Sequence, residues 1–523
     1  MRPAAPKRPS EPKPDKIVIL DFGSQTIQLI ARRIRELGVY SEILSHKTSF
    51  DQLAKDASVK GIILSGGPDS VLGSNAPDMD DAIFSLGIPI LGICYGMQLI
   101  HHKLGGIVSN AASAEYGKAR LRLVKSSPFS NGMNTEQTVW MSHGDHVTQL
   151  AEGFVILGET AESIALSGDL SRRIYTMQFH PEVTQTEAGK IFLSNFVLDI
   201  CQAKPSWNLD FILEEAIRKI RQEVGSNKVM LALSGGVDSS VLAVLLHQAI
   251  GDNLRCFYVN TGLMRKAETK SVMERYRQNY HMDIRCIEAE DRFLSALKGL
   301  TDPEAKRKAI GCEFIRLFEA AKAEFGDCRY LAQGTIYPDV IESQTTQGQG
   351  QTIKSHHNVG GLPDQMAFTL VEPFRKLFKD EVRALGERLG VPKEIIHRHP
   401  FPGPGLAIRV IGEVTKDRLD TLREADDIFI QALHEFSLYD QVSQAFVVLL
   451  PVKTVGVMGD QRTYQEVIAI RSVDTIDFMS ATFSKLPWDF IETVANRIVN
   501  QVRGVNRVVY DVTSKPPGTI EWE

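Results

Sequence analysis

The sequence predicts an α/β protein with two doubly wound parallel-sheet domains followed by a smaller α+β domain. Short β-branched runs alternate with amphipathic stretches along most of the chain before His399. Strands that alternate with helices in this way form parallel sheets, with ligand-binding loops at the carboxyl ends of the strands. The 523 residues also exceed what one hydrophobic core normally holds, so several domains are expected.

Shifts in composition divide the chain into four expected parts. Residues 1–15 contain five prolines and four basic side chains but no apolar run, which predicts a disordered tail and not a signal peptide. Lys204-Pro205-Ser206 is a plausible linker. The run 399–405, His-Pro-Phe-Pro-Gly-Pro-Gly, suits neither a helix nor a central strand and marks a second change. The expected domains are therefore 16–205, 206–398 and 399–523.

Each expected element rests on the spacing of its apolar residues. In the first domain the expected strands are 16–21, 61–64, 88–93 and 174–179, and the expected helices are 27–37 and 95–104. In the second domain the expected strands are 229–233, 256–259 and 283–286, and the expected helices are 210–224 and 240–250. In the third domain a helix is expected over 417–436, and strands over 444–450, 467–473 and 507–511.

Net charge and cysteine usage exclude several classes of protein. The formal net charge is -5, without the basic excess of nucleic-acid binders, so no nucleic-acid partner is expected. The six cysteines include no Cys-x-x-Cys pair, which argues against zinc ribbons and thioredoxin-like redox chemistry. So few cysteines in so long a chain also argue against a disulfide framework and favour a reducing, cytoplasmic compartment. No apolar stretch approaches the ~20 residues that span a bilayer, so no membrane partner is expected.

A cysteine lies between a predicted strand and a predicted helix in Gly92-Ile93-Cys94-Tyr95-Gly96. The flanking glycines permit a sharp turn of the kind that exposes a nucleophile, and the helix N-terminus favours the thiolate. Downstream, the proline in His180-Pro181-Glu182 bends the chain, so that Glu182 can orient His180 as a base for Cys94. Taken singly, Cys94 is also compatible with a buried core cysteine, and His180 with a surface residue.

Together these motifs resemble the class I glutamine amidotransferases over residues 16–202. The resemblance implies that Cys94 is the nucleophile, His180 the general base and Glu182 the residue that orients it. It implies two backbone donors to the oxyanion, from Gly67 and Tyr95. It also implies that glutamine is held by Gln98 and by the loop 142–145, chiefly through Ser142 and His143. Ammonia would be the product that matters.

A second loop, Ser-Gly-Gly-Val-Asp-Ser-Ser at 234–240, lies between a predicted strand and a helix. Glycines let the backbone approach a phosphate, and the helix N-terminus supplies N–H donors. The loop lacks the Gly-Lys-Ser/Thr ending of a Walker A motif, and alone it is compatible with an ordinary strand-to-helix turn. It resembles the PP-loop of ATP pyrophosphatases. The resemblance implies Mg²⁺, held in part by Asp238, and ATP binding by Ser234, Gly235, Gly236, Val237, Asp238, Ser239 and Ser240.

Four further segments, 332–339, 353–358, 399–405 and 515–523, resemble the GMP synthetase family. The resemblance covers nearly the whole chain beyond the tail. It implies glutamine, ATP and xanthosine monophosphate (XMP) as substrates, and a homodimer formed through the third domain. It assigns the ATP phosphates and a closing lid to Asp339, Glu342, Lys354, Lys379 and Asp380, and XMP to Arg307, Lys515 and Glu521. The segment 344–352, which leads towards Lys354, has no hydrophobic period and predicts a mobile loop.

Three other classes share part of this pattern. The tRNA-thiolating enzymes have a PP-loop, but they need sulfur-handling cysteines and a basic RNA-binding face. NAD synthetase joins its PP-loop to a nitrilase-like glutaminase. A non-catalytic binding protein would be expected to have lost one of Cys94, His180, Glu182 or Asp238, and all are present. One departure concerns Asn260, where GMP synthetases usually have aspartate, which removes a charge on the adenosine side.

Overall fold

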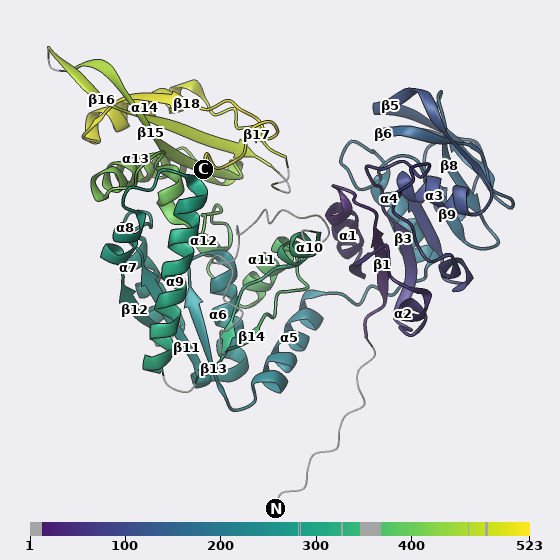
Figure 1. The fold of residues 1–523 in the computed structure, drawn as a ribbon, viewed down its shortest axis with the longest axis horizontal. Coiled ribbons are helices and arrows are strands. Elements are labelled where there is room, and N and C mark those ends of the chain that lie inside the picture. Colours follow the sequence, from purple (N-terminus) through teal and green to yellow (C-terminus); the bar gives the residue numbers. More distant parts are fainter. Residues whose placement is uncertain are drawn as a thin grey trace, which may run out of the picture. The chain divides into compact units, whose positions relative to one another are not determined.

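The computed structural model describes residues 13–280, 282, 284–325, 328–345, 368–458, 460–475, 478 and 480–523. The chain forms two compact units that meet in the sequence between Ile212 and Leu213. The first is coloured purple to blue in Figure 1, and the second teal to yellow. All but the last three residues of the expected tail lie outside the described residues. The expected domain boundaries after residues 205 and 398 stay predictions.

Five parallel strands form one half of the first unit's sheet, in the order β2-β1-β3-β4-β9. They span Tyr40–Ser45, Lys16–Asp21, Val59–Leu64, Ile90–Ile93 and Ile174–Met177. All but β2 are largely buried along their length, as is usual for parallel strands with both faces covered. The strands expected in this unit are confirmed to within two residues at each end.

Helices α1 (Ile27–Glu36) and α3 (Tyr95–Lys103) begin where the sequence predicts them. The buried positions Ile27, Ile30 and Ile34 of α1 recur at helical spacing and form its inward stripe. Helix α3 is buried over most of its length because it packs against β3, β4 and β9. The shorter helices α2 and α4 span Phe50–Ala54 and Gly189–Ser194.

Four antiparallel strands continue this sheet beyond β9, in the order β8-β7-β5-β6. They span Ile164–Asp169, Val155–Glu159, Ile107–Leu123 and Glu136–Gln149. The α/β class is confirmed, but the sequence did not predict these strands. In β6, for example, exposed polar residues alternate with buried ones, so the strand lacks the continuous apolar run that marks a parallel strand.

The larger sheet of the second unit is wholly parallel, in the order β12-β11-β10-β13-β14. Its strands span Ile284–Glu288, Leu254–Asn260, Lys228–Leu233, Cys328–Ala332 and Thr369–Val371. The chain runs outward from β10 to β12 and then returns to the other side of β10, so the strand order reverses between β10 and β13. Open α/β sheets bind ligands at such a reversal, and the loop 234–240 follows β10 there.

Helices connect these strands and flank the sheet (Figure 1). They include α5 (Leu209–Val224), α6 (Val237–Ile250), α7 (Glu268–Tyr280), α8 (Glu290–Leu297), α9 (Pro303–Phe325), α10 (Tyr337–Thr345), α11 (Lys379–Arg388) and α12 (Lys393–Ile396). Helix α6 begins three residues earlier than expected, so half of the predicted phosphate loop belongs to its first turn. The predicted mobile loop starts inside α10 at Gln344, and its remainder from 346 lies outside the described residues.

The third sheet is built on a hairpin of β15 (Gln444–Met458) and β16 (Gln461–Asp474), which Figure 1 draws in light green. Strands β17 (Thr482–Phe483) and β18 (Val505–Tyr510) pair with β16, the second of them in parallel. Helices α13 (Lys416–Glu435) and α14 (Trp488–Gln501) pack on this sheet. One hydrophobic core holds residues of both sheets, so the two sheets form a single unit.

Candidate active sites

Cys94 lies at the turn between β4 and α3, in a backbone conformation that few residues other than glycine adopt. Its φ is 51° and its ψ is -106°, which costs roughly 1–3 kcal/mol and persists only where neighbouring structure imposes it. A Cβ on Gly96 would lie 2.4 Å from the Leu64 carbonyl oxygen, and a Cβ on Gly92 would lie 2.6 Å from the Gly96 carbonyl oxygen. The two glycines therefore permit the close backbone approach that forms the predicted sharp turn.

The Cys94 side chain is only 5% exposed and faces polar groups. Its thiol lies 3.6 Å from the carbonyl oxygen of Ser142, and Nε2 of Gln178 lies 3.7 Å from the sulfur. Because Cys94 immediately precedes α3, the sulfur is attached at a helix N-terminus, where unpaired N–H groups stabilise negative charge. These surroundings suit a nucleophilic sulfur better than an inert core cysteine.

His180 follows β9 and is held by Glu182 two residues later. Its Nδ1 lies 2.8 Å from Oε1 of Glu182, so the ring donates to the carboxylate. Glu182 is fully buried, and the same oxygen accepts a hydrogen bond of 2.6 Å from the Thr26 hydroxyl. Arg33 donates to the backbone carbonyl of Glu182 at 3.2 Å. The structure thus brings Glu182 against His180, as the bend at Pro181 was expected to allow.

Burial alone would lower the pKa of His180. The Glu182 carboxylate and the hydrogen bond to Cys94 outweigh burial and hold that pKa well above the usual 6.5. Burial would raise the pKa of Glu182, but His180 and Thr26 hold it below 4.5. At neutral pH the two side chains form an ion pair, with a protonated imidazole beside the sulfur. Such an imidazole stabilises a thiolate and can give its proton to a leaving group.

The turn after β3 adjoins the same site. A Cβ on Gly66 would lie 3.1 Å from Cε1 of His180 and 3.6 Å from Cβ of Cys94, so this glycine leaves room beside the sulfur. A Cβ on Gly67 would lie 2.5 Å from the carbonyl oxygen of Phe22. Tyr95 is the first residue of α3, where a backbone N–H has no partner within the helix. The two expected oxyanion donors therefore each follow a residue at or beside the sulfur: Tyr95 follows Cys94, and Gly67 follows Gly66.

The expected loop 142–145 is wrong, because these residues lie inside strand β6. Nδ1 of His143 and Nε2 of Gln98 both donate to the carbonyl oxygen of Asp145, at 3.0 and 2.8 Å. Nε2 of His143 lies 3.2 Å from the Glu115 carboxylate. The structure therefore brings the expected glutamine-binding residues together next to Cys94, but on a strand edge and not on a free loop.

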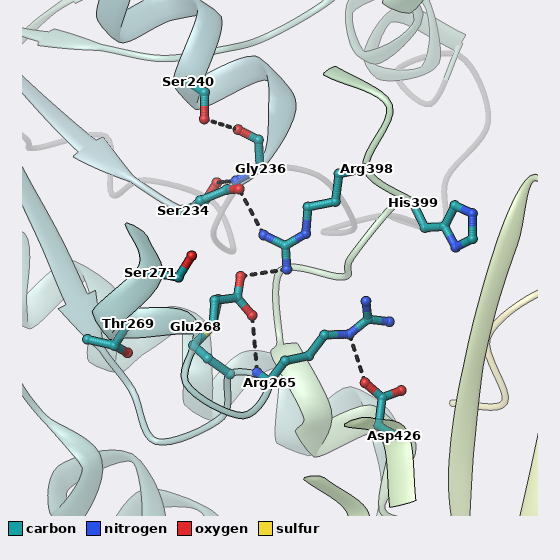
Figure 2. A network of polar contacts seen from close by, with 12 residues as sticks. Ser234, Gly236, Ser240, Arg265, Glu268, Thr269, Ser271, Arg398, His399 and Asp426 are labelled. Atoms are coloured by element: carbon teal, nitrogen blue, oxygen red, sulfur yellow. Dashed lines mark hydrogen bonds and ion pairs between the residues drawn. The ribbon is translucent and has the colours of Figure 1, made fainter. Parts of the chain in front are cut away.

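In the second unit, the loop 234–240 runs from β10 directly into α6. Gly235 has a φ of 74°, which favours glycine. Serine hydroxyls hold the loop together: the Ser234 and Ser239 oxygens lie 2.9 Å apart. Ser240 donates to the Gly236 carbonyl at 2.7 Å (Figure 2). A glycine turn that enters a helix N-terminus is an arrangement that binds phosphate.

Asp238 lies in the first turn of α6, and one of its oxygens is 2.5 Å from Nζ of Lys379. Its other oxygen, Oδ1, is buried without a hydrogen-bond partner among the described atoms. A Cβ on Gly334, after β13, would lie 3.2 Å from Cβ of Asp238. The loops after β10 and β13 and the start of α11 therefore meet at Asp238, with one carboxylate oxygen left for a ligand.

Of the other residues expected at the phosphates, the structure describes the side chains of only some. Asp339 lies in the first turn of α10 and accepts a hydrogen bond of 3.0 Å from the backbone of Ile336. Asp380 follows Lys379 in the first turn of α11. Glu342 belongs to α10, but the structure does not describe its side chain, and Lys354 lies outside the described residues.

A cavity of about 620 Å³ opens at the carboxyl ends of β11 and β12. Asn260, Glu268 and Glu288 are among the residues that line it. The Asn260 amide donates to the Glu288 carboxylate at 2.6 Å, and the Asn260 oxygen accepts from the backbone of Gly262 at 3.3 Å. Asn260 brings no charge of its own, but the Glu288 carboxylate that it contacts puts one negative charge at this edge of the sheet.

The three residues expected to hold XMP contact other parts of the protein in this structure. Arg307, on α9, donates to the backbone oxygen of Glu523 at 2.6 Å. The Glu521 carboxylate receives two hydrogen bonds from Arg409, at 2.8 and 3.0 Å. Lys515 donates to the carbonyl oxygen of Phe478 at 2.7 Å. Arg307 thus contacts the short segment 521–523, to which Glu521 itself belongs, whereas Lys515 contacts a different part of the chain.

Several residues that complete the two sites were not expected from the sequence. Thr26 and Arg33 hold Glu182, and Gln178 faces Cys94. Gln178 had a detectable signal, since it lies two residues before His180, the spacing that puts side chains on one face of an extended chain. Arg398 donates to the Gly235 carbonyl at 3.0 Å. The sequence does not indicate this role of Arg398, because the contact joins residues 163 positions apart.

These sites define a class: an enzyme that combines the cysteine chemistry of the glutamine amidotransferases with an ATP-binding loop. Family models support this class. The class-I glutamine amidotransferase model matches residues 18–200, the NAD synthase model matches 212–303, and the GMP synthase C-terminal domain model matches 431–522.

Relatives along the whole chain make the assignment specific. A glutamine-hydrolysing GMP synthase from Fusobacterium nucleatum is 55% identical, covering 97% of this chain and 99% of the relative. Another, from Thermosynechococcus vestitus, is 55% identical and covers 97% of this chain and 96% of the relative. The chain belongs to the family of glutamine-hydrolysing GMP synthases.

The ion pair between His180 and Glu182 predicts a pH effect. In the variant Glu182→Gln the carboxylate that raises the pKa of His180 is removed, so that pKa should fall. The imidazole would then lose its proton at lower pH, and the alkaline limb of kcat/KM for glutamine should move to lower pH. Thr26→Val removes one hydrogen bond to Glu182 but keeps both charges, so its profile should stay close to that of the parent. An unchanged profile in Glu182→Gln would contradict the ion pair.

Proposed function

We propose that this chain makes GMP from XMP, ATP and glutamine at two separate sites. Glutamine is hydrolysed to glutamate and ammonia in the first unit. In the second, ATP adenylates XMP with release of pyrophosphate, and ammonia displaces AMP from the adenylate to give GMP. The supporting observation is that one chain of this family carries both the Cys94, His180 and Glu182 site and a PP-loop.

Cys94 is the proposed nucleophile of the glutaminase half-reaction. Its thiolate adds to the side-chain amide carbon of glutamine, and the N–H groups of Gly67 and Tyr95 stabilise the oxyanion. The adduct collapses to a thioester as ammonia leaves with the proton of His180. Neutral His180 then takes a proton from a water molecule that attacks the thioester. Glutamate is released, and the original protonation states of Cys94 and His180 are restored.

Substrate glutamine is proposed to lie against Gln98, Ser142 and His143. The Ser142 carbonyl is already close to the sulfur, at 3.6 Å. His143 and Gln98 both donate to the Asp145 carbonyl and so hold the edge of β6 in place, which fixes the Ser142 carbonyl beside Cys94. Carbonyl acceptors suit the ammonium and amide N–H groups of glutamine, whose carboxylate needs donors instead.

The adenylation half-reaction is proposed to take place at the loop 234–240. A XMP oxygen attacks the α-phosphorus of ATP, the bond to the β-phosphate oxygen breaks, and pyrophosphate leaves. Ammonia then attacks the activated carbon, and AMP leaves. The helix N-terminus at Val237 and the Lys379 ammonium supply the positive potential that the departing pyrophosphate needs.

Asp238 is the proposed protein ligand of Mg²⁺. No cluster of three His, Cys, Asp or Glu side chains forms a metal cage within the part of the chain that the structure describes. Mg²⁺ is commonly held by one or two carboxylates together with substrate phosphates, and the unpaired Oδ1 of Asp238 fits that role. When bound with ATP, the ion neutralises phosphate charge. Asp339, Glu342, Lys354 and Asp380 are proposed to complete the phosphate site and its lid.

XMP is proposed to be held by Arg307, Lys515 and Glu521. A guanidinium and an ammonium suit its phosphate, and a carboxylate suits the hydroxyls of its ribose. Since all three side chains have partners within the protein in this structure, XMP must exchange with some of those contacts. Such an exchange would link XMP binding to the position of the segment 515–523.

A reducing, cytoplasmic location is proposed because all six cysteines are free thiols. Among the described helices, none has the length and apolar character required to span a membrane.

A homodimer through the third sheet is proposed from an exposed apolar face of the β15–β16 hairpin. Val455, Val457 and Tyr464 are 60%, 73% and 67% exposed, and Val455 is paired with Tyr464 across the hairpin. Exposed apolar side chains that cluster on one face commonly mark a protein interface. Two copies of one face can cover each other about a two-fold axis.

Cys94→Ala should abolish glutamine-dependent GMP formation, because the nucleophile is lost. GMP formation from high ammonium salt should persist, since the second site is untouched. Cys312→Ala is a matched control, because Cys312 is an exposed free thiol in the second unit. If ammonium fails to rescue a folded Cys94→Ala protein, the assignment of separate sites is wrong.

Asp238→Asn should lower XMP-dependent pyrophosphate release by about 10- to 100-fold, since a charged hydrogen bond is worth about 1.5–3 kcal/mol. Lys379→Ala removes the ammonium that lies against Asp238, so this variant should also lower pyrophosphate release. Glutaminase activity should be kept in both variants. Lys219→Ala, on the exposed face of α5, serves as the control. Full pyrophosphate release by Asp238→Asn would remove Asp238 from the phosphate site.

The double variant Val455→Asp, Val457→Asp should convert the dimer into a monomer, because each carboxylate would be buried in the interface. Light scattering gives the mass directly. Leu170→Asp changes an exposed apolar residue of the first unit and should leave the dimer intact. A dimeric double variant would mean that the hairpin is not the interface.

A further inference from the structure

The guanidinium group of Arg398 binds a backbone carbonyl of the phosphate loop. Arg398, which follows α12, donates from Nη1 to the carbonyl oxygen of Gly235 at 3.0 Å. Its other terminal nitrogen, Nη2, lies 2.6 Å from Oε1 of Glu268. Both side chains are mostly buried, with exposed fractions of 16% and 6%. Figure 2 shows Arg398 between the loop and Glu268.

The position of the Gly235 carbonyl matters because of the charge of the ligand. A loop binds phosphate when its N–H groups face the anion, and a carbonyl oxygen on that side would repel it. Gly235 has a φ of 74°, and glycine residues interconvert between backbone conformations more easily than other residues. A bond to the Gly235 carbonyl therefore fixes the peptide that follows it, whose N–H, on Gly236, donates to the Ser234 hydroxyl oxygen at 3.3 Å. Fixing this peptide holds the path of the loop into the first turn of α6, where further N–H groups are available to an anion.

Glu268 keeps Arg398 in place. Its second oxygen, Oε2, accepts a hydrogen bond of 3.1 Å from the backbone N–H of Arg265, so the carboxylate is held at both ends. A Cβ on Gly235 would lie 3.4 Å from Oε1 of Glu268 and 3.7 Å from Nη1 of Arg398, which shows how closely the pair adjoins the loop. The carboxylate also balances the charge of Arg398.

The same contacts extend to the helix that packs on the third sheet. The Arg265 side chain lies 2.9 Å from the carboxylate of Asp426, a residue of α13 that is 1% exposed. The Phe401 ring lies under two of these guanidinium groups, at 5.3 Å from Arg265 and 5.7 Å from Arg398. The phosphate loop is therefore tied to the 399–405 segment and to α13.

We propose that Arg398 and Glu268 are positioning residues for ATP pyrophosphate cleavage: together they lock the Gly235 peptide so that the loop presents N–H groups to the departing pyrophosphate. The inference rests on the proposed function, because it needs the loop to bind the β- and γ-phosphates. Neither side chain touches the reacting atoms. Their effect is to keep the loop in the one conformation that stabilises charge as it develops, and this should appear in kcat more than in the KM for ATP.

The test uses the full chain and measures XMP-dependent pyrophosphate release with ammonium as the nitrogen source. Arg398→Ala and Glu268→Ala should each lower kcat by at least about tenfold, the equivalent of one charged hydrogen bond of roughly 1.5–3 kcal/mol. Because the two side chains act as one unit, the double variant should lose little more than either single variant. Arg398→Lys keeps the charge but not the two-pronged geometry, so it should recover only part of the loss.

Controls separate this idea from a simple loss of folding and from an error in the proposed function. Arg497→Ala breaks an exposed ion pair with Glu435, between α14 and α13, and should keep the parent kcat. Glutaminase activity and the melting temperature report on folding. If the parent chain releases no pyrophosphate with XMP, the proposed function fails. If the parent is active, then a full kcat in Arg398→Ala, or additive losses in the double variant, would overturn the positioning role.

Discussion

The close approach of helix α3 to strand β3 is the constraint on which the glutaminase site depends. Gly96 lies over the Leu64 carbonyl so closely that any side chain would overlap it. Cys94, two residues before Gly96, therefore lies in a turn with positive φ, and its sulfur is near His180 and Gln178. The cost of the turn is met by the burial of α3 and β3 in the surrounding core, so the stability of the sheet maintains the geometry of the nucleophile.

Paired charges perform a similar task at both sites. Glu182 fixes the protonated ring of His180, Asp238 lies against the ammonium of Lys379, and Glu268 holds Arg398. A buried charge is costly unless a partner and hydrogen bonds compensate for it, so each pair fixes the position of its cation. The proposed uses of the three cations differ: His180 as a proton donor, Lys379 as a phosphate ligand, and Arg398 as the group that holds the phosphate loop. A single physical device thus serves two unrelated reactions.

The departure at Asn260 is easier to understand beside its neighbour. An aspartate there would face Glu288 across 2.6 Å, where two carboxylates repel each other unless one is protonated. The amide instead donates to Glu288, and the pair keeps one negative charge at the ends of β11 and β12. Residues 260 and 288 are paired across adjacent parallel strands, so their side chains meet at one edge of the sheet.

Most of the parallel strands, some of the helices and the order of the two sites follow from local pattern, since a run such as 16–21 or a loop such as 234–240 carries its own signal in neighbouring residues. Strands β2, β13 and β14 and most helices of the second unit were not expected. The resemblance to known families supplied the substrates and most site residues. The antiparallel half of the first sheet was not predicted, because a half-exposed strand such as β6 mixes polar and apolar residues. For the same reason Ser142 and His143 were expected in a loop, although they lie in β6. The contacts of Thr26 with Glu182 and of Arg398 with Gly235 were not predicted either. Each joins residues more than a hundred positions apart, and only the packing of strand ends against one another decides which distant side chains share a site.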